Sequence, residues 1–227
     1  VLHGRNVSRA FLSSKIVLKI FMRMKMIKSK VFTKIAILIL IFVFNFNPLY
    51  GNDNETSLWV ENLGNSALSI LGNPNITNDK KEIFLEEIFI NNLDIKRVSL
   101  FVLGPYRKSL DKEDSLKYFQ SIEDFISEVY AKRLLSYPSG NIQIIKNEDK
   151  GKRGNIVYSL VKFNDRPKPI SIDWWVIKNK VGINKVFDMR ISGIWMAQEQ
   201  RSTFTSFLSK NNGDINKLIN RLNSQSR

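Results

Sequence analysis

Hydrophobic residues between positions 56 and 104 recur mostly at intervals of three and four, the spacing of amphipathic helices. The first such stretch covers residues 56–71 and ends at Gly72. A second helix is expected to begin at Asn78 or Asp79, either of which can act as its N-cap. A third is expected to begin at Asp94 and to stop at residues 104–105, where the sequence Gly-Pro cannot continue a helix.

The strongest helical pattern follows from Asp111, whose side chain suits an N-cap and which precedes acidic residues that favour the positive end of a helix. Its hydrophobic positions form one wide stripe over roughly 25 residues, nearly 40 Å at 1.5 Å per residue. Proline and glycine at positions 138–140 end the pattern. The stripe consists of Leu116, Phe119, Ile122, Ile126, Val129, Tyr130 and Leu134.

From Asn141 the hydrophobic period changes to two, which indicates β-strands. Four strands are predicted. The first begins near Ile142, and the other three cover residues 156–163, 170–177 and 186–191. Charged or glycine-containing turns separate them, so short hairpin connections and an antiparallel meander are expected. Within 170–177, one alternating face is fully apolar, with Ile170, Ile172, Trp174 and Val176.

Two further helices are predicted at the end of the sequence. The first covers residues 197–208 and stops at Gly213, and the second is capped by Asp214. Helices, then four strands, then helices form an α+β arrangement with helices packed on one face of a four-stranded antiparallel meander sheet. The sequence shows neither an internal repeat nor a low-complexity linker, so residues 52–227 are expected to form a single domain.

The formal net charge of +14 suggests nucleic-acid binding until it is divided along the chain. Residues 1–51 hold nine of the 35 lysines and arginines and no acidic residue, so 26 basic residues face 21 acidic ones in the rest, a net charge of only +5. The basic segment leads into ten apolar residues, 35–44, too few for a membrane span but typical of a signal peptide. We therefore expect residues 1–51 to be an N-terminal extension and signal peptide, and the exported chain to begin near Asn52.

Two alternatives concern this segment. An uncleaved N-terminal anchor would explain the same apolar run, although its length favours a signal peptide. Residue 1 is Val, so we expect either a true start at Met24 or Met26, or a basic extension without a fold of its own.

The candidate chemistry is limited by composition. The sequence has no cysteine, and its one histidine, His3, lies in the segment expected to be removed. Cys-His and Ser-His-Asp catalysis and His/Cys metal sites are thereby excluded, and no cofactor is indicated. Asp173 and Asp188 lie on neighbouring predicted strands and could form a general acid/base pair, which leaves a hydrolase as a remote hypothesis.

Aromatic residues are frequent for one modest domain, among them Trp174, Trp175, Trp195, Phe101, Phe119, Phe125, Phe163, Phe187, Phe204 and Phe207. Two interpretations remain open from composition alone. The side chains could fill a dense core, as in an interaction module without a ligand. Alternatively, the sheet and its helices could leave an apolar ligand cavity between them.

Three stretches occur in a characteristic order along the chain. They are residues 101–106 (FVLGPY), the aromatic helix through Tyr137, and residues 191–204, which contain an R-x-x-F motif at Arg201 and Phe204. They end in residues 212–222, NGDINKLINRL. Over nearly all of residues 52–227, this pattern resembles the MlaC / toluene-tolerance family of periplasmic phospholipid-binding proteins. The chain departs from the family pattern at Arg107, where an aromatic residue is expected, and near Asn184, where tryptophan is expected.

The resemblance implies a non-enzymatic carrier of glycerophospholipid in the periplasm. It would work between an outer-membrane lipoprotein complex and an inner-membrane ABC transporter complex, helping to maintain outer-membrane lipid asymmetry. A hopanoid-associated branch of the same build is the alternative. No nucleic-acid partner is expected.

The expected lipid-binding residues combine the apolar strand face with the aromatic helices. Arg201 is added because a guanidinium can donate two parallel hydrogen bonds to a phosphodiester. The competing interpretation is a structural arginine, either solvated or paired with a strand carboxylate such as that of Asp188. The remaining expected lining residues are Phe101, Phe125, Val129, Tyr130, Leu134, Val161, Ile172, Trp174, Val176, Phe187, Met189 and Ile191.

Overall fold

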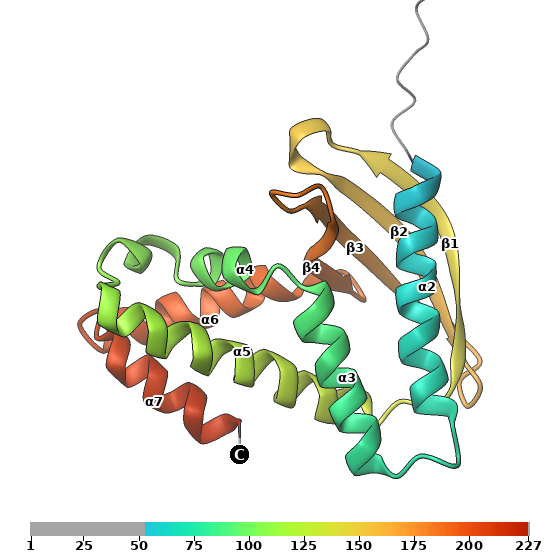
Figure 1. Ribbon diagram of the computed structural model, residues 1–227, viewed down its shortest axis with the longest axis horizontal. Coiled ribbons are helices and arrows are strands. Elements are labelled where there is room, and N and C mark those ends of the chain that lie inside the picture. The colour runs from blue at the N-terminus through green and yellow to red at the C-terminus, as the bar shows by residue number, and fades with distance from the viewer. Residues whose placement is uncertain (1–52, 227) are drawn as a thin grey trace, which may run out of the picture. The chain divides into compact units, whose positions relative to one another are not determined.

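The computed structural model describes residues 53–226. The expected signal peptide and N-terminal extension, residues 1–51, lie outside the described residues. Within 53–226 the chain has the predicted α+β arrangement, in which helices precede and follow an antiparallel sheet (Figure 1).

The helices before the sheet are α2 (Asp53–Gly72), α3 (Asn78–Asn92), α4 (Ile95–Val102), the 3₁₀ turn η1 (Gly104–Lys108) and α5 (Lys112–Leu134). Asp94 and Asp111 cap α4 and α5 as predicted, each accepting a hydrogen bond from a backbone N–H three residues on. The cap of α3 differs from the prediction, because Thr77 rather than Asn78 or Asp79 accepts the hydrogen bond, from Lys80.

The sheet contains the four predicted strands, β1 (Gly140–Asp149), β2 (Asn155–Phe163), β3 (Ile170–Lys178) and β4 (Asn184–Ile191), and a fifth, β5 (Ile194–Trp195). Every neighbouring pair is antiparallel and the order is β1-β2-β3-β4-β5, with the 3₁₀ turn η2 (Gly151–Arg153) between the first two. The additional strand has only two residues, which is too short for a periodicity to reveal it.

Two closing helices, α6 (Met196–Lys210) and α7 (Ile215–Gln225), complete the fold, the latter capped by Asp214 as predicted. The described residues form three hydrophobic clusters. In the first, α2 packs on the inner face of the sheet through Val60 and Val157, which are fully buried. In the second, helices α4 to α7 pack on one another around Tyr118, Ile122 and Leu218. In the third, Leu85 and Phe89 of α3 pack with Leu71 of α2 and Ala131 of α5; Figure 1 shows α3 between α2 and α5.

A β-bulge interrupts the pairing of β3 with β4. Trp175 faces Asp188, whereas the next residue, Val176, faces Val186, so Phe187 is an extra residue in β4. Beyond the bulge, the alternation of β4 side chains is displaced by one position. This irregularity decides which β4 residues reach the inner face.

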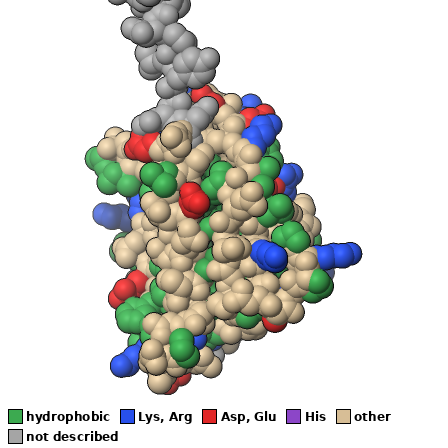
Figure 2. All heavy atoms as spheres, turned by 90° about the vertical axis from the view of Figure 1, so that its right-hand side faces the viewer, with side chains coloured by type: hydrophobic (Ala, Val, Ile, Leu, Met, Phe, Trp, Pro, Cys, Tyr) green, Lys and Arg blue, Asp and Glu red, His purple; other side chains and the backbone are tan. Residues whose placement is uncertain are grey.

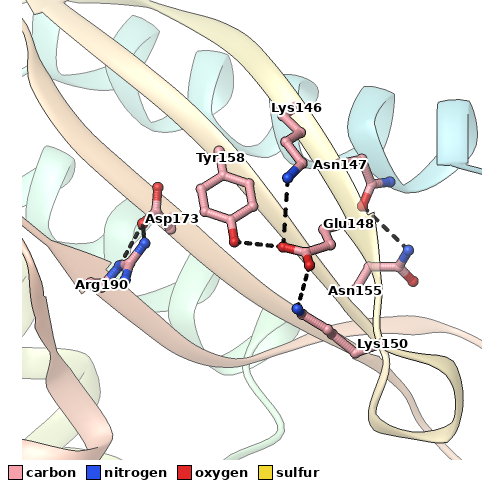
Figure 3. A network of polar contacts seen from close by, with 8 residues as sticks. All are labelled: Lys146, Asn147, Glu148, Lys150, Asn155, Tyr158, Asp173 and Arg190. Carbon is pink, nitrogen blue, oxygen red and sulfur yellow. Dashed lines mark hydrogen bonds and ion pairs between the residues drawn. The ribbon is translucent and has the colours of Figure 1, made fainter.

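The outer face of the sheet, turned away from α2, carries a polar network (Figure 3). Arg190 donates to Asp173 through Nε at 2.6 Å and also pairs with it through Nη2. The Tyr158 hydroxyl donates to Glu148 at 2.8 Å, and Lys150 pairs with the same carboxylate. The hydrogen bonds from Lys150 and Tyr158 lower the pKa of Glu148 to about 2.

Candidate functional site

A cavity of about 340 Å³ lies between the inner face of the sheet and helices α2, α3 and α5. Nearly all of its wall is hydrophobic. Its lining residues come from every one of these elements and from the start of α6: Leu63, Gly64, Ala67, Leu68, Leu71, Ile88, Phe89, Asn92, Leu93, Tyr130, Arg133, Leu134, Tyr137, Ile142, Val161, Phe163, Ile170, Ile172, Trp174, Val186, Met189, Ile191 and Met196.

Helix α2 closes one side of the cavity because it can approach β1 closely. A Cβ atom added to Gly64 would lie 2.7 Å from Cδ1 of Ile142, which is closer than side-chain atoms normally come. Glycine in the middle of a helix costs about 1 kcal/mol relative to alanine, so its presence here indicates a packing requirement. The contact brings Leu63 and Ala67 over the sheet.

The polar atoms deep in the wall are already bonded to protein. Trp174 Nε1 donates to Ser159 Oγ at 3.0 Å, and that hydroxyl donates to the carbonyl of Ile172 at 2.6 Å. The indole therefore presents its hydrocarbon surface to the cavity without leaving an unbonded N–H. The interior consequently offers a ligand dispersion contacts and few hydrogen bonds.

The last two turns of α5 contribute two polar residues to the cavity wall, Tyr130 and Arg133. Arg133 is solvent-exposed, and its Cζ lies 5.3 Å from the centre of the Tyr130 ring. Burial raises the pKa of Tyr130, while the charge of Arg133 lowers it and that of Asp188 raises it further. The phenol therefore stays protonated at neutral pH and keeps a hydrogen that it can donate.

Figure 2 shows the surface that lies on the right of Figure 1, where hydrophobic side chains form separate patches with lysines and arginines toward the margins. Among the described residues, none of the helices combines the length and hydrophobicity needed to cross a membrane.

Seven of the thirteen residues expected from the sequence lie together in the cavity wall. They come from α5 and from three strands of the sheet. This part of the expected set is Tyr130, Leu134, Val161, Ile172, Trp174, Met189 and Ile191.

Six expected residues do not line the cavity, and three of these are apolar or aromatic residues of α4 and α5. Phe125 belongs to the helical core, where its ring lies 6.3 Å from that of Phe204, and Val129 packs against the same core. Phe101 of α4 contacts Phe187 instead, with ring centres 5.3 Å apart. The wide stripe of α5 serves two cores at once, so a position on the stripe does not reveal which side it faces.

Val176 and Phe187 lie outside the lining for different reasons. Val176 is on the inner face as predicted, but it is buried in the filled part of the sheet core with Val60 and Val157. Phe187 is the additional residue of the bulge and packs against Trp175, with ring centres 5.2 Å apart. A strict alternation of side chains along β4 would place Phe187 on the same face as Met189 and Ile191, but the bulge interrupts this alternation.

Arg201, the sixth, lies beside η1 rather than at the cavity. Its Nη1 donates to the carbonyl of Phe101 at 3.1 Å, and its Cζ lies 4.8 Å from the centre of the Phe101 ring. Phe204, one turn further along α6, is 2% exposed and points into the helical core. These contacts match the structural interpretation of Arg201, with a backbone carbonyl in place of the expected carboxylate.

The two strand carboxylates do not act as a pair. Asp173 is bound to Arg190, its register partner. Asp188 Oδ1 accepts hydrogen bonds from the backbone N–H groups of Met189 and Ala197, both at 2.8 Å, and so caps the start of α6. Both residues are buried, and Asp188 Oδ2 has no hydrogen-bond partner among the described residues. This geometry gives no support to the two-carboxylate hydrolase hypothesis.

The lining residues that the sequence did not identify come mainly from α2 and α3. Their helical spacing was recognisable, but periodicity alone does not say which surface a helix covers. Gly64 was the available signal, since a mid-helix glycine often marks a close contact. Within residues 53–226, no group of three or more His, Cys, Asp or Glu side chains could hold a metal ion.

Comparison with known proteins gives consistent matches. The profile of the family described as MlaC protein matches residues 61–224. A curated relative, the intermembrane phospholipid transport system binding protein MlaC of Haemophilus influenzae, is 30% identical over 111 residues, which are 48% of this chain and 52% of the relative. The matched part thus spans about half the length of that relative.

A solved structure, the phospholipid-binding protein from Ralstonia solanacearum in complex with a phospholipid, shares the fold with a TM-score of 0.64. The similarity covers 75% of this chain and 96% of that one at 20% sequence identity, so it concerns the fold alone. The family profile covers well over half of the sequence and reaches from α2 to α7. The chain therefore belongs to the MlaC protein family.

Proposed function

We propose that this chain binds a glycerophospholipid with its acyl tails inside the cavity and carries it between two membranes. The observation that carries the proposal is the hydrophobic cavity of about 340 Å³ between the sheet and α2, α3 and α5. Its volume lies within the range of about 300–1,000 Å³ that is typical of ligand sites. A domain with a solid core would lack such a space, so the cavity favours a carrier over a ligand-free interaction module.

The energetics of lipid transfer explain why a cavity suffices. Burying one CH₂ group is worth about 0.8 kcal/mol, so exposing a tail of about 15 such groups to water costs roughly 12 kcal/mol. A hydrophobic cavity removes most of that cost during transfer. No bond is made or broken, which agrees with a site built from apolar side chains.

The cellular setting belongs to the same proposal. The curated relative is named as part of an intermembrane phospholipid transport system, and residues 1–51 have the charge and hydrophobicity of a signal peptide. We place the carrier in the periplasm, where it would exchange lipid with an outer-membrane lipoprotein complex and an inner-membrane ABC transporter complex. Transfer between them would help to maintain the lipid asymmetry of the outer membrane.

Native mass spectrometry tests lipid binding directly. Protein exported to and purified from a bacterial periplasm is expected to carry the mass of a diacyl phospholipid. Tandem fragmentation of the released ligand distinguishes a phospholipid from a hopanoid. Protein that is purified without lipid and takes up none from phospholipid vesicles would contradict the proposed function.

A further inference from the structure

One residue in the cavity wall is exposed to solvent. All the other lining residues are buried or half-buried, whereas Arg133 is open to water while still bordering the cavity. An exposed lining residue marks the place where the cavity meets the solvent. A ligand whose tails fill the interior must lead its polar end out past this point.

The guanidinium of Arg133 is held in place without being neutralised. It lies over the Tyr130 ring, with Cζ 5.3 Å from the ring centre, a geometry that leaves its edge N–H groups free to donate. Among residues 53–226, no carboxylate lies within ion-pair distance of it. The adjacent Lys132, by contrast, pairs with Glu82 of α3 at 3.6 Å.

Tyr130 adds a second donor at the same place. Its side chain lines the cavity beneath Arg133, and none of the described residues forms a hydrogen bond with its hydroxyl group. A protonated phenol and an unpaired guanidinium together suit an anionic oxygen, because charge-assisted hydrogen bonds to such oxygens are the stronger kind. Arg166, which lies over the lining rings of Tyr137 and Phe163, differs because it pairs with Asp165 at 3.6 Å.

We propose that Arg133, assisted by the Tyr130 hydroxyl, binds the phosphodiester of the lipid headgroup at the opening of the cavity. The inference rests on the proposed function, since it requires that acyl tails occupy the interior. It assigns to Arg133 the role that the sequence suggested for Arg201. The chemistry recognised is a phosphodiester, so lipids without a phosphate should bind less well.

The test compares two lipids that share the same tails. Lipid-stripped periplasmic protein is mixed with vesicles containing equal amounts of phosphatidylglycerol and diacylglycerol, and native mass spectrometry gives the ratio of the two bound lipids. The wild type is expected to prefer phosphatidylglycerol. Arg133→Gln should lower the ratio about tenfold, as the loss of one charge-assisted hydrogen bond predicts, and Arg133→Lys should give an intermediate value.

Lys132→Gln is the matched control, because it removes the same charge one residue away at a side chain that does not line the cavity. It should leave the ratio unchanged. A wild-type ratio in Arg133→Gln, or an equal fall in both glutamine variants, would overturn the assignment. A wild type that binds neither lipid would instead refute the proposed function.

Inorganic phosphate distinguishes a headgroup site from a site for the free anion. Calorimetric titration of the lipid-stripped wild type with inorganic phosphate alone is expected to show no saturable binding, because the tails supply most of the affinity. Saturable binding that is lost in Arg133→Gln would show that the residue serves a free anion and would overturn the headgroup assignment.

Discussion

At the scale of single residues, the two arginines Arg201 and Arg133 lie in different surroundings. Arg201 is half-buried and donates to the carbonyl of Phe101 while its guanidinium lies over the same ring. Removal of the Arg201 side chain would leave the Phe101 carbonyl without this hydrogen-bond donor and the Phe101 ring without its cation–π contact. Arg133 is exposed and also lies over a ring, that of Tyr130, but within residues 53–226 it donates to no backbone carbonyl.

Arg201→Ala is therefore expected to destabilise the domain by about 1–2 kcal/mol, from one lost hydrogen bond and one lost cation–π contact. For a domain of this size, that corresponds to a fall in the melting temperature of roughly 2–8 °C. Bound lipid should be unchanged by native mass spectrometry. Lipid lost at an unchanged melting temperature would show that Arg201 does contact the ligand.

Asp188 has a different structural role, joining β4 to the start of α6. Its Oδ1 accepts the N–H of Ala197, whereas Oδ2 is buried without a partner. Burial raises the pKa of this carboxyl, although the backbone hydrogen bonds oppose the shift. Asp188→Ala removes the cap and should cost about 1–2 kcal/mol, while Asp188→Asn keeps an oxygen acceptor and should cost less.

The raised pKa also fixes the sign of a pH dependence. Between the unfolded value, about 3.9, and the higher folded value, the native state binds more protons than the unfolded state, so stability falls as the pH rises. The free energy of unfolding of the wild type relative to Asp188→Asn should therefore decline above about pH 4 and level off beyond the folded pKa. Urea unfolding of both proteins over this range measures the difference, and a constant difference would contradict the assignment.

At the scale of secondary-structure elements, helix α2 forms one wall of the cavity. Ala67 lines the cavity, and its neighbour Ser66 is exposed on another side of the helix. Ala67→Trp should fill part of the cavity and lower lipid occupancy severalfold in native mass spectrometry. Ser66→Trp adds the same side chain outside and should bind lipid as the wild type does; equal occupancy in the two variants would argue against lipid in this cavity.

The elements themselves were largely predictable from the sequence, because caps and periodicity are local signals. Asp94, Asp111 and Asp214 cap the helices they were expected to cap. The two-residue β5 was missed, since two residues have no measurable period. Helix α3 is capped by Thr77 and not by the expected Asn78 or Asp79, because the extended backbone of Thr77 places its side-chain oxygen toward the N–H of Lys80.

The cavity wall was less predictable because it depends on contacts between distant elements. The inner face of β3 followed from alternation, and Ile172 and Trp174 line the cavity accordingly. In β4 the bulge at Phe187 shifted the alternation, and no sequence signal marked it. On α5 the hydrophobic stripe is divided between two cores, so Phe125 packs on the helices while Leu134 borders the cavity.

At the scale of the whole domain, the sheet separates two surfaces with different properties. Its inner face and α2, α3 and α5 enclose the apolar cavity, while its outer face carries the ion pairs of Figure 3. Trp174 faces inward and lines the cavity, whereas Trp175 faces outward and its Nε1 donates to the carbonyl of Arg153 at 2.7 Å. Two adjacent tryptophans thus report on opposite sides of the sheet.

Quenching of Trp174 by a lipid with brominated acyl tails tests most directly whether the tails occupy this cavity. In a variant with Trp59, Trp175 and Trp195 replaced by Phe, the remaining Trp174 should lose most of its fluorescence when the brominated phospholipid is loaded. A matched variant that retains Trp175 and carries Phe at the other three positions should keep its fluorescence. Equal quenching of the two variants, or an unquenched Trp174 in protein shown to hold the lipid, would contradict the account.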